Sequence, residues 1–158
     1  MILVIGYGNP LRRDDGVGWA VIAAIQAQAP PDVTCLAVHQ LTPELSEAVA
    51  HADVVILIDA SIEGEAGDVH ITPILPCRDG TPTMTHHLSP RSLLDMTQWL
   101  YDKSPFTLLM TITGADFGVG EGLSDVVRGK VAPLADLIVW CATQSCHADL
   151  KKRTTDAL

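Results

Sequence analysis

The chain begins with an apolar run, a glycine-containing turn and a helical pattern, and this succession constrains the fold more than any other feature. The run is "MILVI", the turn is "GYGNPLRRDDGVG" (residues 6–18), and the helical pattern covers about 16–28. Two more apolar runs lie at 33–38 and 54–58, separated by a second helical pattern at 42–50. Strands that are apolar throughout are typical of parallel sheets buried on both faces. The sequence therefore predicts a β-α-β-α-β beginning.

The second half of the chain continues the pattern with two strands and two helices. In order, these are a strand near 68–72, a helix from Ser89 to about Tyr101, a strand at 106–113 and a helix from Leu123 to about Cys146. Pro73 and Pro76 soon follow the first of these strands, and prolines so close to a strand favour a position at the edge of the sheet. An edge strand there could run antiparallel to its neighbour. Pro133 is a candidate break in the last helix. We predict a three-layer α/β/α sandwich with a mostly parallel sheet of about five strands.

Length, composition and charge limit the domain organisation and the partners. With 158 residues, 47% of them hydrophobic, we expect a single domain over residues 1–150 and a polar tail over 151–158. The net charge of -9 and the isoelectric point near 4.8 argue against nucleic acid or an anionic membrane as a partner. No apolar run approaches the roughly 20 residues that cross a bilayer, and no basic leader precedes the first strand. We expect a cytoplasmic protein.

The opening turn is a poor match to a nucleotide site. It offers Gly6 and Gly8, but Leu11 stands where a dinucleotide fingerprint needs its third glycine. Asp14 and Asp15 would repel a phosphate in the same turn. A nucleotide-binding domain is therefore kept only as a minor alternative. Asp14 is the better candidate for capping the helix that follows, which leaves Asp15 to be explained.

A second aspartate points to a metal site. Asp15 lies beyond the first strand, and Asp59 closes the third strand in "VVILID". The carboxyl ends of parallel strands meet at one edge of a sheet, so we expect the two side chains to share a crevice there. His86 or His87, after the fourth strand, could add an imidazole. Carboxylate and imidazole ligands accommodate nickel, zinc, iron or manganese.

Four motifs give a more specific interpretation. They are "GYGNPLRRDDGVG", "VVILIDAS", "THHLSPRSLL" and "GEGLSDVV", in this order and spacing over nearly the whole chain. In these motifs the chain resembles the hydrogenase maturation endopeptidases, also called hydrogenase maturation proteases. The resemblance implies an endopeptidase that removes the C-terminal extension of the nickel-iron hydrogenase large-subunit precursor after nickel insertion. The partner implied is that precursor, and the metal is the nickel that it carries; other divalent metals could occupy the site in isolation.

The resemblance also assigns the site. The family's three metal ligands fall on Asp15, Asp59 and His86, which are then also the candidate catalytic residues, with His87 as the alternate histidine and Asp14 supporting the helix start. Two departures from the family pattern are notable: some relatives carry Glu at the position of Asp15, and "PR" follows Ser89 where apolar residues are expected. The stretch "HQLTPEL" is similar to the branch that serves soluble, NAD-coupled bidirectional hydrogenases.

Two mechanisms are compatible with these residues. In one, the metal polarises the scissile carbonyl or activates a water, with a nearby carboxylate as base. In the other, nickel only positions the precursor tail and another group performs the chemistry. No HExxH element and no Ser-His-Asp order is evident in the sequence. A binding module that checks or delivers nickel without proteolysis is the main alternative to the enzyme.

Overall fold

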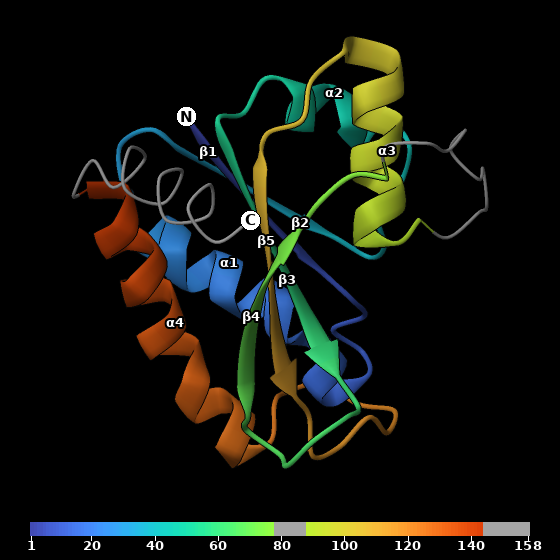
Figure 1. Cartoon of the computed structure of the whole chain (residues 1–158). Coiled ribbons are helices and arrows are strands. Elements are labelled where there is room, and N and C mark those ends of the chain that lie inside the picture. The colour runs from blue at the N-terminus through green and yellow to red at the C-terminus, as the bar shows by residue number, and fades with distance from the viewer. Residues whose placement is uncertain (78–87, 144–158) are drawn as a thin grey trace.

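The fold is a five-stranded, mostly parallel sheet (Figure 1). The computed structural model describes residues 1–77 and 88–143. The strand order is β2-β1-β3-β5-β4, and only β4 runs antiparallel to its neighbour within these described residues. The strands are β1 (Ile2–Tyr7), β2 (Val33–Val38), β3 (Val54–Ser61), β4 (Val69–Ile74) and β5 (Phe106–Thr113). The predicted fold class, including the antiparallel edge strand, is confirmed.

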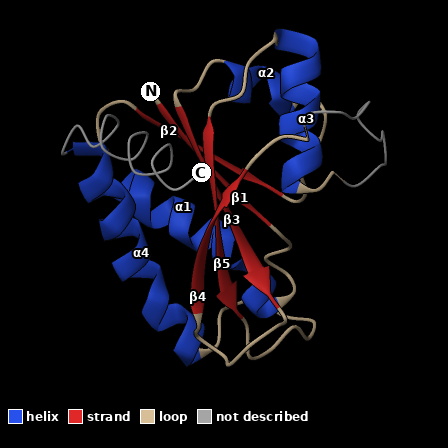
Figure 2. Cartoon of the chain, in the orientation of Figure 1, coloured by secondary structure: helices blue, strands red, loops and turns tan. Residues whose placement is uncertain are grey.

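Helices cover both faces of the sheet, so the molecule has three layers (Figure 2). They are η1 (Arg13–Gly16), a short 3-10 helix, followed by α1 (Val17–Gln28), α2 (Leu45–Ala50), α3 (Pro90–Tyr101) and α4 (Asp125–Thr143). Helices α1 and α4 pack on one face, over a core that includes Val4, Ile56 and Ile112. Helices α2 and α3 pack on the other face, over a core that includes Leu3 and Leu57.

Several element boundaries differ from the sequence prediction. Strand β1 continues through Gly6 and Tyr7, and β3 continues past Asp59 to Ser61, because both strands keep their pairing beyond their apolar runs. Strand β2 lies at an edge of the sheet and is half-buried, so its apolar composition overstated its burial. Strand β4 includes Pro73, which an edge position tolerates.

The last two helices, α3 and α4, agree with the sequence prediction at one point and differ from it at another. Ser89 caps α3 as predicted: its hydroxyl accepts a hydrogen bond from the Ser92 amide (3.1 Å), and Pro90 occupies the first helical position. In contrast, α4 runs through Pro133 without a break. Because Pro133 has no N–H, the Gly129 carbonyl lacks its usual helical donor. Both residues are exposed, so water can donate a hydrogen bond to that carbonyl instead. No helix in the described ranges has the length and hydropathy to span a membrane.

Helix α1 approaches the sheet unusually closely at a pair of glycines. A Cβ atom on Gly18 would lie 2.8 Å from the Tyr7 backbone nitrogen and 2.9 Å from the Ile58 carbonyl oxygen. A Cβ on Gly6 would meet the Gly18 carbonyl oxygen from the other side. The close helix-to-strand packing that a third fingerprint glycine provides in dinucleotide folds is thus supplied here by Gly18. This packing fixes α1 over the junction of β1 and β3.

Candidate active site

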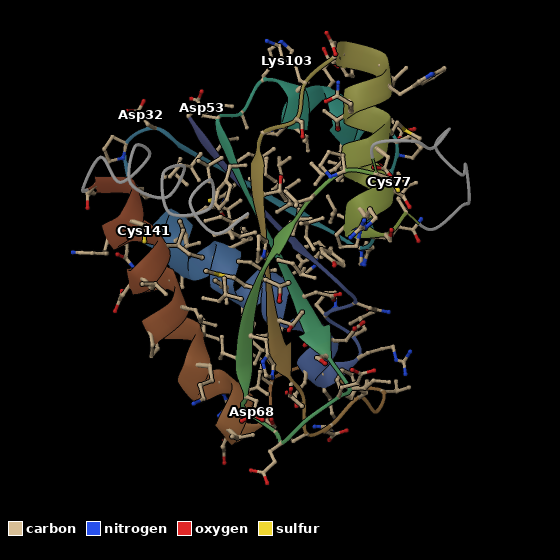
Figure 3. All side chains as sticks on the ribbon, viewed as in Figure 1. Asp32, Asp53, Asp68, Cys77, Lys103 and Cys141 are labelled. Atoms are coloured by element: carbon tan, nitrogen blue, oxygen red, sulfur yellow. The ribbon has the colours of Figure 1, made fainter. Side chains whose placement is uncertain are left out.

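The two predicted carboxylates lie at the carboxyl edge of the sheet, where the strand order reverses. From β1 the chain crosses to β2 on one side and later returns to β3 on the other, so the reversal lies between β1 and β3. In open α/β sheets this position forms the ligand crevice. Asp53, just before β3, lies at the top of Figure 3, whereas Asp68, just before the antiparallel β4, lies at the bottom. The carboxyl ends of the parallel strands therefore face the bottom of the view.

Asp15 belongs to η1 and is held by the turn that precedes it. One carboxylate oxygen, Oδ2, accepts a hydrogen bond from the Asn9 amide at 2.8 Å. Gly8 adopts a φ of +129°, and a Cβ there would collide with the Asp15 carbonyl oxygen. Only glycine allows the turn to close over Asp15 in this way. The side chain is half-buried.

Asp59 lies on β3, and its carboxylate is also half-buried. Burial raises the pKa of this carboxyl to about 6, although hydrogen bonds from the Tyr7 hydroxyl and the Ala60 amide act in the opposite direction. The Ala60 amide donates to Oδ1 at 2.8 Å. The negative charge of Asp15 raises the pKa further. Since η1 lies against β3, the two carboxylates are close enough to interact electrostatically at this edge of the sheet.

Asp14 does not cap the helix, and that prediction is wrong. Neither η1 nor α1 has a side-chain cap. Instead the fully buried Asp14 carboxylate accepts four hydrogen bonds from the loop after β5, at 2.7–3.0 Å, from the Ala115, Asp116 and Ser124 amides and the Ser124 hydroxyl. Burial alone would raise the pKa of Asp14, but these hydrogen bonds prevail and hold it below its usual value. Asp14 therefore fastens a distant loop to η1.

The same loop is joined to the opening turn by backbone contacts. The Gly120 amide donates to the Leu11 carbonyl (2.8 Å), and the Arg13 amide donates to the Gly120 carbonyl (3.0 Å). The Arg13 guanidinium pairs with Asp116 at 3.2 Å. These contacts fix the segment that carries Asp15.

Residues 8–15 of the turn have no amide left for a phosphate. From residue 8 to residue 15 every backbone N–H donates to an acceptor within the protein, Pro10 having none to donate. A phosphate-binding loop needs free amides at this place. The geometry therefore disfavours the nucleotide-binding alternative.

His86 and His87 lie outside the described residues. Within the described ranges, no group of three His, Cys, Asp or Glu side chains could hold a metal ion. Leu88, the next residue along the chain, is buried in the core under α2 and α3. The structure thus places Asp15 and Asp59 at the same edge of the sheet, and the role of Asp15, Asp59 and His86 as metal ligands stays a prediction.

Sequence reasoning missed the side chain of Tyr7, because it treated that residue only as part of the opening turn. The tyrosine is the last residue of β1, and its hydroxyl donates to Asp59. Burial and the Asp59 carboxylate raise the pKa of Tyr7. Extending β1 by two residues in the parallel register would have found this contact, since Gly6 pairs with Ile58.

Neither a protein-family model nor a curated protein matches the chain, but solved structures do. The structure of the NiFe hydrogenase maturation protease HycI from Thermococcus kodakarensis KOD1 matches with a TM-score of 0.73 and 25% identity, over 90% of this chain and 92% of that one. The hydrogenase maturating endopeptidase HybD from E. coli has the same fold, with a TM-score of 0.71 and 24% identity over 91% and 93% of the two chains. A solution structure of an endopeptidase from Escherichia coli shares it too, with a TM-score of 0.69 and 23% identity over 91% and 93%. The resemblance in sequence motifs is thus confirmed by structure: the chain is similar to solved hydrogenase maturation proteases and has their fold, and peptidase is the enzyme class that this similarity supports.

Proposed function

We propose that this protein removes the C-terminal extension of the nickel-iron hydrogenase large-subunit precursor once nickel has been inserted. The nickel belongs to the precursor, and Asp15, Asp59 and His86 recognise it; His87 is the alternate histidine. The observation that supports the proposal is the electrostatic interaction of Asp15 with Asp59 at the carboxyl edge of the sheet, where the strand order reverses between β1 and β3. Two carboxylates plus an imidazole form a donor set that suits a divalent transition metal.

The acidity of Asp59 suits proton transfer near neutral pH. A general base works best when its pKa lies close to the working pH, and before any nickel approaches, burial brings the pKa of Asp59 to about 6. We propose that nickel polarises the scissile carbonyl or a water molecule, while a carboxylate of the pair accepts the proton. The competing hypothesis, in which nickel only positions the tail, does not require Asp59 to have a pKa near neutral.

The test is mass spectrometry of the precursor incubated with this protein, with and without nickel. We expect loss of a C-terminal peptide only with nickel, and little or no loss with Asp59→Asn or His86→Ala. Asp136→Asn is the matched control, because this aspartate lies on α4 and its carboxylate contacts Gln28. Full processing by Asp59→Asn would contradict the role of this carboxylate, and processing by His86→Ala but not by His87→Ala would transfer the histidine role to His87.

A nickel-checking or nickel-delivery module is the second candidate. It predicts a stable complex with the nickel-loaded precursor and no change in the precursor's mass. The similarity of "HQLTPEL" (residues 39–45) to the NAD-coupled branch favours a precursor of that kind as the first substrate to try. Cytoplasmic location stays a prediction.

A further inference from the structure

Tyr7 and Asp59 are neighbours on adjacent strands. In the parallel pairing of β1 with β3, Gly6 lies opposite Ile58. The next residue of β1 is Tyr7 and the next residue of β3 is Asp59, so these two residues lie beside each other. Side chains alternate between the two faces of a strand. Tyr7 shares its face with Leu3 and Ile5, which belong to the core under α2 and α3. The Asp59 side chain emerges on that same face of the sheet.

Two donors hold the Asp59 carboxylate. The Ala60 amide donates to Oδ1, and the Tyr7 hydroxyl donates to the carboxylate from β1. The tyrosine ring packs against the core, which limits the positions that its hydroxyl can take. Carboxylates that bind metals usually carry such outer hydrogen bonds, which set the direction of the remaining lone pairs.

We propose that Tyr7 is a positioning residue: its hydroxyl, together with the Ala60 amide, fixes the Asp59 carboxylate in the orientation that faces the precursor's nickel. This inference rests on the proposed function. A phenylalanine at position 7 would fill nearly the same space in the core but would supply no donor. The hydroxyl therefore orients the Asp59 carboxylate, whereas the ring contributes to the packing of the core.

The experiment is an NMR titration of the full chain, labelled with carbon-13 at the aspartate carboxyl groups, with Ni²⁺ alone. Bound Ni²⁺ is paramagnetic and broadens the signals of nearby carboxyl carbons, so even weak binding is detected. We compare the wild-type protein with Tyr7→Phe and Asp59→Asn. Tyr101→Phe is the control, because Tyr101 is the other tyrosine of the chain and lies exposed at the end of α3.

We expect Asp59→Asn to abolish the broadening at Asp15, and Tyr7→Phe to weaken Ni²⁺ binding about tenfold, as is usual when an outer partner of a ligand is lost. Tyr101→Phe should bind like the wild type. The series is repeated across pH 5 to 8. The groups that act on Asp59 are Tyr7 on β1, Asp15 on η1 and the Ala60 amide on β3. Removing the Tyr7 donor should move the pH midpoint of binding upward, whereas a general loosening of the fold would weaken binding equally at every pH.

The outcomes separate this inference from the function on which it rests. Unchanged Ni²⁺ binding in Tyr7→Phe, with binding lost in Asp59→Asn, would overturn the role of Tyr7 and leave the proposed function standing. Binding that survives Asp59→Asn, or no binding in the wild-type protein at millimolar Ni²⁺, would contradict the site itself. A uniform loss at every pH would make Tyr7 a structural residue only.

Discussion

Adjacent aspartates in one turn have different environments, and the environment decides what each can do. Asp14 is fully buried, yet the four hydrogen bonds that it accepts keep it charged. Asp15 is half-buried and accepts one amide hydrogen bond from Asn9. Asp59, across the crevice, has too few donors to offset its burial, so its pKa rises to about 6. A carboxylate that is costly to keep charged is one that a cation can stabilise.

This cost predicts that Asp59→Asn stabilises the protein at neutral and higher pH. The folded pKa of about 6 lies above the ordinary value of 3.8, so the folded protein holds this proton more tightly than the unfolded chain does. The contribution of Asp59 to stability is therefore fully present below pH 3.8 and is lost as the pH rises through about 6. We expect the free energy of unfolding to increase by about 1–3 kcal/mol at pH 8 in the variant.

Urea unfolding at pH 8 and at pH 4.5 checks this expectation. The gain should shrink at the lower pH, where the wild-type carboxyl is already largely protonated. Asp136→Asn, on the surface of α4, should change stability by less than about 0.5 kcal/mol at both values. A gain of equal size at both pH values would mean that the substitution acts through something other than the charge of Asp59.

At the scale of elements, the close contact of α1 with β1 and β3 sets the geometry of the site. A Cβ on Gly18 would press on the backbone atoms of Tyr7 and Ile58, which cannot turn aside as a flexible side chain can. Tyr7 and Ile58 flank the crevice, since the next residue of β3 is Asp59. A small displacement of α1 is therefore expected to change the distance between the two carboxylates.

We expect Gly18→Ala to lower the free energy of unfolding by about 1–3 kcal/mol, the usual effect of overpacking. The matched control is Gly129→Ala within α4, where an added Cβ meets nothing within 4 Å. That variant should be more stable by about 0.5–1 kcal/mol, because alanine favours a helix over glycine. Urea unfolding measures both, and a Gly18→Ala protein as stable as the wild type would show that α1 can withdraw from the sheet without loss.

Most elements could be predicted from the sequence, because apolar runs and helical patterns report burial directly. The prediction matched β2 and β5 to the residue and placed the cap of α3 at Ser89. It shortened β1 and β3, since their last residues are polar or small although their pairing continues. Asp15 and Asp59 could be placed together from the rules of parallel sheets. The partners of Asp14 could not, because they lie about a hundred residues away along the chain.

At the scale of the whole molecule, Asp14 joins the start of the chain to its last third. Asp14→Ala would leave three amides and one hydroxyl of the 115–124 segment without their acceptor. We expect a loss of about 3 kcal/mol in the free energy of unfolding, measured with urea at pH 7. Asp125→Ala, a similarly charged but exposed neighbour on α4, should cost less than about 0.5 kcal/mol. Equal losses in the two variants would contradict the special role of Asp14.

The contact between Asp14 and Ser124 spans 110 positions of the chain. A growing polypeptide exposes Asp14 and Asp15 early in synthesis, but the Asp14 carboxylate lacks its full set of four donors until Ser124 has left the ribosome. Contacts of such long sequence separation form slowly, because a large loop must close first. We therefore expect the segment that carries Asp15 to become fully ordered only after Ser124 has been made. A translation product that ends before Ser124 is therefore expected to lack a fully ordered Asp15 segment.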